Sequence, residues 1–309
     1  MNVGNLFALN GKIETEALSV VGFQFAPIGA QCFDEVDENI DTVLEYMERA
    51  VAGFPGLDLF VAPEACFQGF PPSGWQDYLL DINGFRIQRV KDKCKELNIW
   101  GIFNPLVKPT NGNCYENTAI VIDNNGHIVH KYTKMNPWIP FETMHPGISC
   151  PVCDGPKGSK IGIIICADGD YPEMWREAAY NGANVIVRPT HYMDPWSHAW
   201  DITNKAGAYF NQVYVVAVNC SGYAKNESFS CFGRSMILGP DGNVIVEGSN
   251  GNIGLIKADL YPGIIDHMRK QAVHSNPMYS FRHRGGSCPD FDGKGDVRML
   301  YNAYKEDAK

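Results

Sequence analysis

The stretch Ile161-Gly-Ile-Ile-Ile-Cys166-Ala-Asp-Gly-Asp-Tyr-Pro-Glu173 places a thiol where an apolar run gives way to the start of a helix. The run is β-branched and contains glycine, which predicts a buried strand. Pro172 and Glu173 are typical of the first turn of a helix. Unpaired backbone N–H groups at a helix start lower the pKa of a nearby thiol and favour the thiolate. Cys166 is therefore a candidate nucleophile, although free cysteine also commonly fills space in a core.

Two further predicted strands end in a charged side chain. Leu57-Asp-Leu-Phe-Val-Ala-Pro-Glu64 ends in a carboxylate, and Ile128-Val-His-Lys-Tyr-Thr-Lys134 ends in an amine. In open α/β sheets, ligands bind and chemistry collects at the carboxyl ends of the strands. We therefore expect Glu64, Lys134 and Cys166 to lie together at such an edge.

Predicted strands and helices alternate along the chain. Apolar residues recur at helical spacing over 36–47 and 87–97, on both sides of the strand that ends at Glu64. The second half repeats the pattern, with helices expected over 172–181 and about 195–210. Two similar βαβ halves, each a sheet with helices on one face, would bury their open faces against each other. The sequence thus predicts an α/β fold, built as a four-layer αββα sandwich.

The composition is that of an ordinary globular protein. The 309 residues are 45% hydrophobic and 20% charged, which allows a large core. No Ser/Pro-rich or charged tract separates the apolar segments. We expect a single domain over 1–309, with a core over about 18–260 and a tail over 261–309. The net charge of −9 at pH 7 argues against nucleic-acid binding, which relies on basic clusters.

The sequence indicates neither a membrane segment nor a metal site. No apolar run approaches the ~20 residues that span a bilayer, and residues 1–9 lack the basic start and apolar core of a signal peptide. A cytoplasmic protein is expected, with its ten cysteines reduced. Cys150 and Cys153 form a CxxC pair, but no second ligand pair accompanies them. No metal and no cofactor are predicted.

The order Glu64, Lys134, Cys166 resembles the Glu-Lys-Cys triad of the nitrilase superfamily of carbon-nitrogen hydrolases. Residues 166–173 are similar to the cysteine motif of its aliphatic amidase and formamidase branch, whereas nitrile-hydrolysing members usually carry Cys-Trp-Glu. Glu142 matches a second glutamate that these amidases carry eight residues after the lysine. The resemblance also implies the four-layer fold. Further similar segments are Gly155-Pro-Lys-Gly-Ser-Lys160, Arg176-Glu-Ala-Ala-Tyr-Asn-Gly182 and His283-Arg-Gly285.

The resemblance implies thiol-dependent hydrolysis of a short aliphatic amide, of the formamide or acetamide class. Cys166 would attack the carbonyl carbon and form a thioester while ammonia leaves, and water would then release the acid. Glu64 would carry the protons, with its pKa raised by burial. Lys134 would donate to the oxyanion together with a backbone N–H near Cys166 or Ala167, or would only pair with Glu142.

The same resemblance assigns further residues to the pocket. Glu142 would orient either the substrate or Lys134. Trp138 and Tyr192 match positions that line the small pocket of formamidases and aliphatic amidases, where large rings exclude long acyl chains; each could instead be ordinary core packing. Asp168 would either fix the amide nitrogen or cap the helix that follows.

Other functions stay open. An N-carbamoyl hydrolase or ω-amidase of the same superfamily would normally want a charged group at the pocket mouth, and Arg188 and His191 are candidates for it. A non-catalytic binding protein on the same fold belongs to a different class, and the presence of all three triad residue types argues against it. A papain-like protease has less support, because no histidine has a recognisable local context.

The helices expected over 172–181 and 195–210 carry small and aromatic residues on more than their inward face. A helix of this kind is typically covered by something else. We therefore expect a homodimer or a higher homo-oligomer through these helices, as the resemblance also implies. The residues concerned are Trp175, Ala178, Ala179, Trp200, Ala206, Ala208 and Tyr209.

Overall fold

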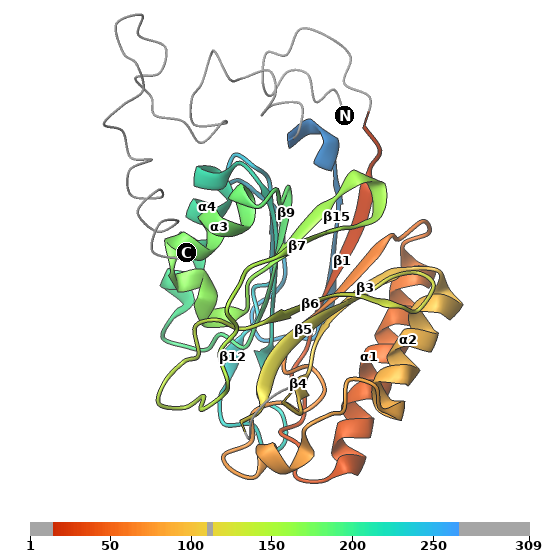
Figure 1. Cartoon of the computed structure of the whole chain (residues 1–309), viewed down its shortest axis with the longest axis vertical. Helices are drawn as coiled ribbons and strands as arrows, with labels where there is room; N and C mark the ends of the chain where they lie inside the picture. The colour runs from red at the N-terminus through yellow and green to blue at the C-terminus, as the bar shows by residue number, and fades with distance from the viewer. Residues whose placement is uncertain (1–14, 110–113, 266–309) are drawn as a thin grey trace, which may run out of the picture.

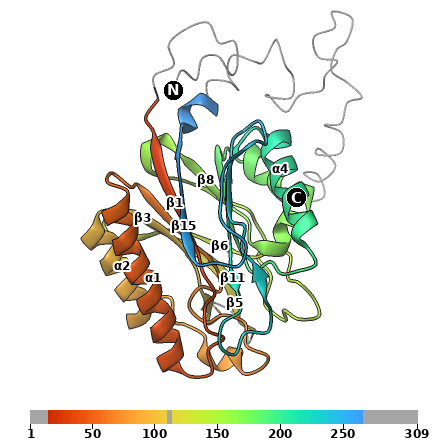
Figure 2. The same cartoon turned by 180° about the vertical axis from the view of Figure 1, so that it is seen from behind.

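The fold is a stack of four layers. The computed structural model describes residues 15–109 and 114–265. Two sheets lie face to face in the middle, and helices cover the outer side of each (Figure 1 and, from behind, Figure 2). This arrangement confirms the predicted αββα sandwich. Within the described ranges, no helix is long and apolar enough to cross a membrane.

The first sheet has seven strands in the described ranges, in the order β15-β1-β2-β3-β5-β4, with β6 paired to β5. β1, β2 and β3 run parallel, and the strands outside them pair antiparallel. The apolar runs of the central strands fit a sheet that is covered on both faces. The strands are β1 (Leu18–Gln24), β2 (Leu59–Glu64), β3 (Trp100–Asn104), β4 (Leu106–Val107), β5 (Glu116–Ile122), β6 (Ile128–Thr133) and β15 (Gly254–Leu260).

The second sheet repeats this plan with six strands in the described ranges, in the order β14-β13-β10-β9-β8-β7. Its centre, β8-β9-β10, is parallel, and its outer strands are antiparallel. A separate ribbon pairs β11 with β12. The strands are β7 (Val152–Asp154), β8 (Lys160–Ile163), β9 (Val185–Thr190), β10 (Tyr214–Asn219), β11 (Ser221–Gly222), β12 (Cys231–Phe232), β13 (Met236–Leu238) and β14 (Val244–Glu247).

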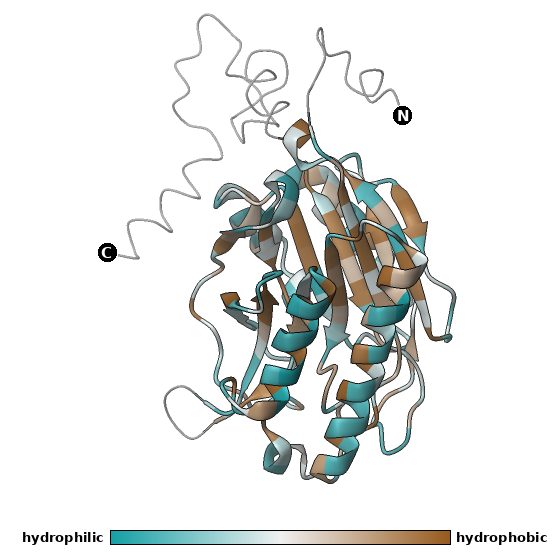
Figure 3. Ribbon diagram, turned by 90° about the vertical axis from the view of Figure 1, so that its right-hand side faces the viewer, coloured by the Kyte–Doolittle hydropathy of each residue, from teal (hydrophilic) through white to brown (hydrophobic). Residues whose placement is uncertain are grey.

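Helices α1 and α2 cover the first sheet, and α3 and α4 cover the second (Figure 1). The buried residues of α1 recur at helical spacing, as at Val36, Ile40 and Val43, so one stripe packs on the sheet. Figure 3 shows polar residues on the outward faces of α1 and α2. The helices are α1 (Phe33–Gly53), α2 (Phe85–Leu97), α3 (Pro172–Tyr180) and α4 (Ser197–Asn211), with short 3-10 helices η2 (Trp75–Tyr78), η3 (Pro156–Gly158) and η4 (Cys166–Asp170).

Alternate residues of the central strands point into different layers. Val20 of β1 and Val61 of β2 join the core between the two sheets, together with Val187 of β9. Val21 and Phe60, one position away, belong to a second core under α1 and α2. This is the period of two that a strand imposes on its side chains. Both faces of the first sheet are therefore buried.

The helices predicted over 172–181 and 195–210 are present as α3 and α4. Most of the residues that we assigned to a partner interface are instead buried in the core of this chain, including Trp175 and Trp200. The reason is the close packing of α3 on α4, where a Cβ at Gly207 would lie 2.5 Å from the Trp175 ring. Exposed apolar side chains on these two helices include Tyr180, Ile202, Tyr209 and Phe210.

The single domain over 1–309 stays a prediction. The core predicted over about 18–260 corresponds to the two packed sheets and their helices. The predicted tail beyond residue 265, including His283-Arg-Gly285, lies outside the described residues.

Candidate active site

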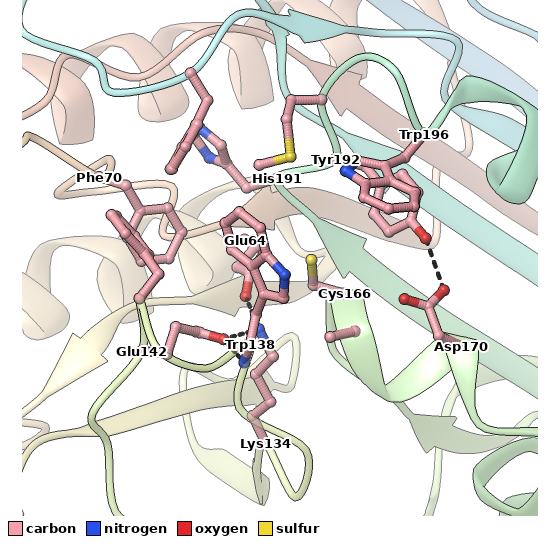
Figure 4. Close-up of a pocket in the computed structure, with 14 residues that line it drawn as sticks. Glu64, Phe70, Lys134, Trp138, Glu142, Cys166, Asp170, His191, Tyr192 and Trp196 are labelled. Atoms are coloured by element: carbon pink, nitrogen blue, oxygen red, sulfur yellow. Dashed lines mark hydrogen bonds and ion pairs between the residues drawn. The ribbon is translucent and has the colours of Figure 1, made fainter.

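Glu64, Lys134 and Cys166 meet in one pocket (Figure 4). Glu64 is the last residue of β2, Lys134 directly follows β6, and Cys166 opens η4 after the end of β8. The first sheet thus supplies the two charged groups and the second sheet supplies the thiol. The three side chains line a cavity of about 130 Å³, together with Glu142 and several aromatic rings.

The Lys134 side chain lies between two carboxylates. Its Nζ donates to Glu64 Oε1 at 2.8 Å and to Glu142 Oε2 at 2.6 Å, and all three residues are buried. Burial alone would lower the pKa of Lys134, but the negative charges of Glu142 and Glu64 outweigh it and hold the pKa well above its ordinary value. Lys134 is therefore a permanent cation in the pocket.

The same contact with Lys134 sets the protonation state of Glu64. Burial raises the pKa of Glu64, but the charge and the hydrogen bond of Lys134 outweigh burial, and a hydrogen bond from the Cys166 thiol adds to their effect. The pKa of Glu64 consequently lies below its ordinary value. The raised pKa that burial led us to expect is wrong, because the cation lies within hydrogen-bond distance. Glu64 is an ionised carboxylate that can accept a proton.

The Cys166 thiol is protonated in the resting site. Burial and the charge of Glu64 raise its pKa well above the ordinary value, and Lys134 offsets this only in part. The sequence led us to expect the opposite shift from a helix start. However, η4 separates the thiol from α3, and a helix terminus acts only over its first turn. The resting site thus pairs a neutral thiol with a carboxylate.

The backbone at Cys166 adopts φ +48, in the left-handed region that non-glycine residues rarely occupy. Arg188 of β9 holds it there, because its Nη2 and Nε donate to the Cys166 carbonyl at 2.7 and 3.1 Å. Nη1 of the same side chain donates to Thr203 at 2.8 Å and to Asn204 at 2.9 Å. Arg188 is fully buried and does not line the pocket, so it is not the charged group at the pocket mouth for which it was a candidate.

Asp168 also lies outside the pocket, fully buried. Its Oδ2 accepts from the Tyr132 hydroxyl at 2.7 Å and from the Ile165 N–H at 2.9 Å. Its Oδ1 accepts from the backbone and side-chain N–H groups of Asn136, at 2.8 and 2.9 Å. The contact with an amide nitrogen, one of the two roles expected of Asp168, finds no support in this arrangement, since protein donors occupy both oxygens. The bond to Ile165 caps η4, to which Asp168 itself belongs, and not the following helix α3, whose N-cap Tyr171 has no side-chain cap hydrogen bond.

Trp138 and Tyr192 line the pocket, as predicted. Trp138 is 41% exposed, and its backbone N–H donates to Glu142 Oε2 at 2.7 Å. Tyr192 is buried, and its hydroxyl donates to Asp170 Oδ1 at 2.7 Å (Figure 4). Glu142 thus connects the loop that carries Trp138 to the amine of Lys134.

Sequence reasoning missed the amides that hold the two carboxylates. Asn117 of β5 donates from Nδ2 to Glu64 Oε1 at 2.8 Å and to Glu142 Oε1 at 3.0 Å. Asn104, the last residue of β3, donates in turn to Asn117 Oδ1 at 2.8 Å. The sequence did contain a sign of these contacts, because both asparagines lie within apolar strands. A polar side chain buried in such a strand needs a hydrogen-bond partner.

The CxxC cysteines lie apart from this pocket. Cys150 is buried with its thiol 3.7 Å from the Ile163 carbonyl, and Cys153 is partly exposed; neither forms a disulfide. In the described part of the chain, no cluster of three or more His, Cys, Asp or Glu side chains is placed to hold a metal ion.

The chain is similar to known proteins along most of its length. The model of the carbon-nitrogen hydrolase family matches residues 24–270. A formamidase from Bacillus thuringiensis (strain Al Hakam) is 36% identical over 254 residues, which cover 81% of this chain and 76% of that protein. A formamidase from Helicobacter acinonychis (strain Sheeba) is 33% identical over 304 residues, which cover 97% and 89%.

The fold has solved counterparts as well. The crystal structure of Saccharomyces cerevisiae Nit3, a member of branch 10 of the nitrilase superfamily, matches with a TM-score of 0.74 at 23% identity, over 85% of this chain and 96% of that one. This likeness concerns the fold. Because the family model spans most of the chain and curated relatives exceed 30% identity, the chain belongs to the carbon-nitrogen hydrolase family.

Proposed function

We propose that this protein hydrolyses a short aliphatic amide, of the formamide or acetamide class, through a thioester on Cys166. The observation that carries the proposal is a neutral thiol paired with an ionised carboxylate beside a permanent cation, all in one pocket. Relatives named formamidase at 33 and 36% identity support the substrate class.

The first half of the reaction forms the thioester. Glu64 takes the proton of the Cys166 thiol as the sulfur attacks the carbonyl carbon, and the carbonyl electrons move onto oxygen. Lys134 Nζ, with a backbone N–H near Cys166 or Ala167, stabilises the resulting oxyanion. The protonated Glu64 then gives its proton to the leaving nitrogen. Ammonia departs, and the acyl group stays on sulfur.

The second half releases the acid and restores the thiol. Water attacks the thioester carbon while Glu64 accepts one of its protons, and Lys134 again stabilises the oxyanion. The carbon–sulfur bond breaks, and Glu64 returns the proton to Cys166. One amide and one water thereby give one carboxylic acid and one ammonia.

Glu142 is best explained as a positioning residue for Lys134. Its Oε2 accepts from Lys134 Nζ and from the Trp138 N–H, and its Oε1 accepts from Asn117. These contacts hold the amine in place and keep it charged. A residue with both oxygens engaged in this way has little capacity left to bind substrate.

The walls of the pocket favour a small acyl group. Rings of Phe70, Trp138, Phe141, Tyr192 and Phe229 line it, and together they fill volume that a longer chain would need. Discrimination of this kind is worth roughly 1–3 kcal/mol per methylene.

The rival substrates find less support in the pocket. An N-carbamoyl or ω-amide substrate with a distal carboxylate would need a free cation, but Lys134 is paired with two carboxylates and His191 with Glu227. Arg188 is buried outside the pocket. A non-catalytic binding role would leave the thiol, the carboxylate and the amine without a purpose.

Ammonia release tests the proposal. Purified protein would be incubated with formamide, acetamide, propionamide, an N-carbamoyl amine and a nitrile. Cys166→Ala should abolish release, and Cys153→Ala, at a thiol of similar exposure outside the pocket, should leave it unchanged. Release from formamide or acetamide that disappears only in Cys166→Ala supports the proposal. No ammonia release from any amide would contradict the proposal.

A further inference from the structure

A buried acid–base pair, His191 and Glu227, lies at the wall of the pocket, which His191 helps to line, and the proposed chemistry does not use it. His191 follows β9, and its Nε2 lies 2.9 Å from Glu227 Oε2. Glu227 belongs to the loop between β11 and β12. Both residues are only 3% exposed. A buried pair of this kind constrains the segments that carry it, because losing either group leaves a buried polar atom, His191 Nε2 or Glu227 Oε2, without this bond.

The second carboxylate oxygen of Glu227, Oε1, binds a third segment, the turn after β2. Oε1 accepts from the backbone N–H of Phe70 at 2.7 Å, and Ser228 N–H donates to the Phe70 carbonyl at 3.0 Å. Gly69 permits this approach, since it adopts φ +60 and a Cβ there would lie 2.0 Å from Glu227 Oε1. One carboxylate thus joins the turn after β2, the end of β9 and the loop after β11.

These three segments carry part of the pocket wall. The Phe70 ring packs edge-on against His191 with centroids 5.1 Å apart, and Figure 4 shows the two residues together at the cavity. Phe70 also contacts Phe141 at 5.9 Å, which contacts Phe229 at 4.9 Å. Phe229 lies two residues after Glu227 and contacts Trp138 at 5.7 Å. Phe70, Trp138, Phe141 and Phe229 form an aromatic wall, all four lining the cavity.

We propose that Glu227 and His191 are specificity-determining positioning residues, which fix this aromatic wall and thereby exclude acyl groups longer than that of acetamide. The inference rests on the proposed amide hydrolysis. Phe70 and Phe229 are the wall members on the segments that Glu227 holds. Cutting the pair frees these segments to move outward, which opens space for a longer chain. Because His191 also lowers the pKa of Glu64, the ratio between substrates, and not the overall rate, reports on the wall.

The test measures kcat and KM separately for formamide, acetamide, propionamide and butyramide. In Glu227→Ala, the ratio of kcat/KM for butyramide to that for formamide should rise about tenfold or more. This is the discrimination that a hydrophobic pocket typically exerts against one extra methylene group. The KM of formamide should rise more than its kcat falls. Glu227→Gln keeps an acceptor for the Phe70 N–H and should restore most of the wild-type ratio.

A matched control is available in the same loop. Lys225, two residues before Glu227, pairs with Glu35 of α1 at 2.7 Å and does not line the pocket. Glu35→Ala therefore removes an ion pair of this loop away from the wall and should leave the ratio unchanged. If Glu227→Ala does not fold, His191→Asn carries the test, because it cuts the tie to β9 and keeps the bond between Glu227 and Phe70.

Two results would overturn the inference. The first is an unchanged ratio in variants that fold, whether or not the melting temperature falls. The second is an equal loss on all four amides, which would place the effect on the catalytic groups instead of the wall. Failure of the proposed function looks different, because the wild type would then release ammonia from none of the amides.

Discussion

At the scale of single residues, Lys134 decides the protonation of the site. Without this cation, burial would favour a neutral Glu64; with it, Glu64 is ionised and the thiol keeps its proton. In the proposed reaction, the same lysine faces the oxyanion that forms. A fixed charge that is already in place needs no reorganisation when the negative charge develops. The order of protonation is therefore a property of the Lys134 contacts and not of Cys166 alone.

The pair of Lys134 and Glu64 predicts a pH dependence of stability. The folded pKa of Glu64 lies below its unfolded value of about 4.3, so its contribution is full above that pH and is lost as the pH falls through the folded pKa. The folded pKa of Lys134 lies above its unfolded value of about 10.4, so its contribution is lost only as the pH rises through the folded pKa.

The difference in melting temperature between wild type and Glu64→Gln checks this directly. It should be constant between about pH 5 and about pH 9, and it should shrink in acid. Glu45→Gln, which removes an exposed pair with Arg49, serves as the control with little difference at any pH. A difference that grows as the pH falls would contradict the direction assigned to Glu64.

At the scale of elements, the short helix η4 positions the thiol. Its first residue, Cys166, has a φ of +48. The Asp168 carboxylate caps η4 by accepting from the Ile165 N–H, and the Arg188 guanidinium donates to the Cys166 carbonyl. A Cβ at Gly169 would lie 2.2 Å from the Arg188 guanidinium, so the glycine is required for that contact. Several contacts at once therefore hold the Cys166 backbone in its rarely occupied conformation, as is usual for strained residues at functional sites.

Arg188→Met should destabilise the protein by about 2–5 kcal/mol, because three buried or partly buried acceptors lose their donor at once. They are the Cys166 carbonyl and the side-chain oxygens of Thr203 and Asn204. Chemical denaturation gives the free energy of unfolding. Arg234→Met, which removes partly exposed pairs with Asp201 and Glu247, should cost about 1 kcal/mol or less. Equal costs for the two variants would contradict the anchoring role.

The sequence could predict which strands end at the site, but not which way every side chain points. Glu64, Lys134 and Cys166 were recognisable because each closes an apolar run with a reactive group. Arg188 and Asp168 sit on the same edges, and only the packing of η4 decides that they lie outside the pocket. The pKa directions of Glu64 and Cys166 depend on neighbours far away in sequence, so local reasoning about burial and helix starts gave the wrong sign.

At the scale of the whole molecule, the site exists only because two sheets pack together. The carboxylate and the amine come from the first sheet and the thiol from the second, so the reacting groups assemble as the sandwich closes. The overall fold was predictable, since the alternation of apolar strands and amphipathic helices recurs in both halves. Which helical residues would face outward was not, because the mutual packing of α3 and α4 buries their tryptophans.

We propose that the outer face of α3 and α4 forms a homodimer interface. Ile202, Tyr209 and Phe210 of α4 are 53, 46 and 54% exposed, and an exposed apolar patch of this kind typically marks an interaction surface. Light scattering at micromolar concentration should give a dimer or a larger assembly. Phe210→Glu should shift it towards the monomer, whereas Phe85→Glu, on the opposite outer layer, should not. A monomeric wild type would contradict the proposal.

The covalent intermediate tests the central claim most directly. Wild-type protein turning over acetamide would be quenched in acid and digested, and the peptide that contains Cys166 would be weighed by mass spectrometry. We predict a gain of one acetyl group on the Cys166 thiol, which disappears when the substrate is exhausted. Steady release of ammonia with no acyl group on Cys166, or the same release from Cys166→Ala, would contradict thiol catalysis in this pocket.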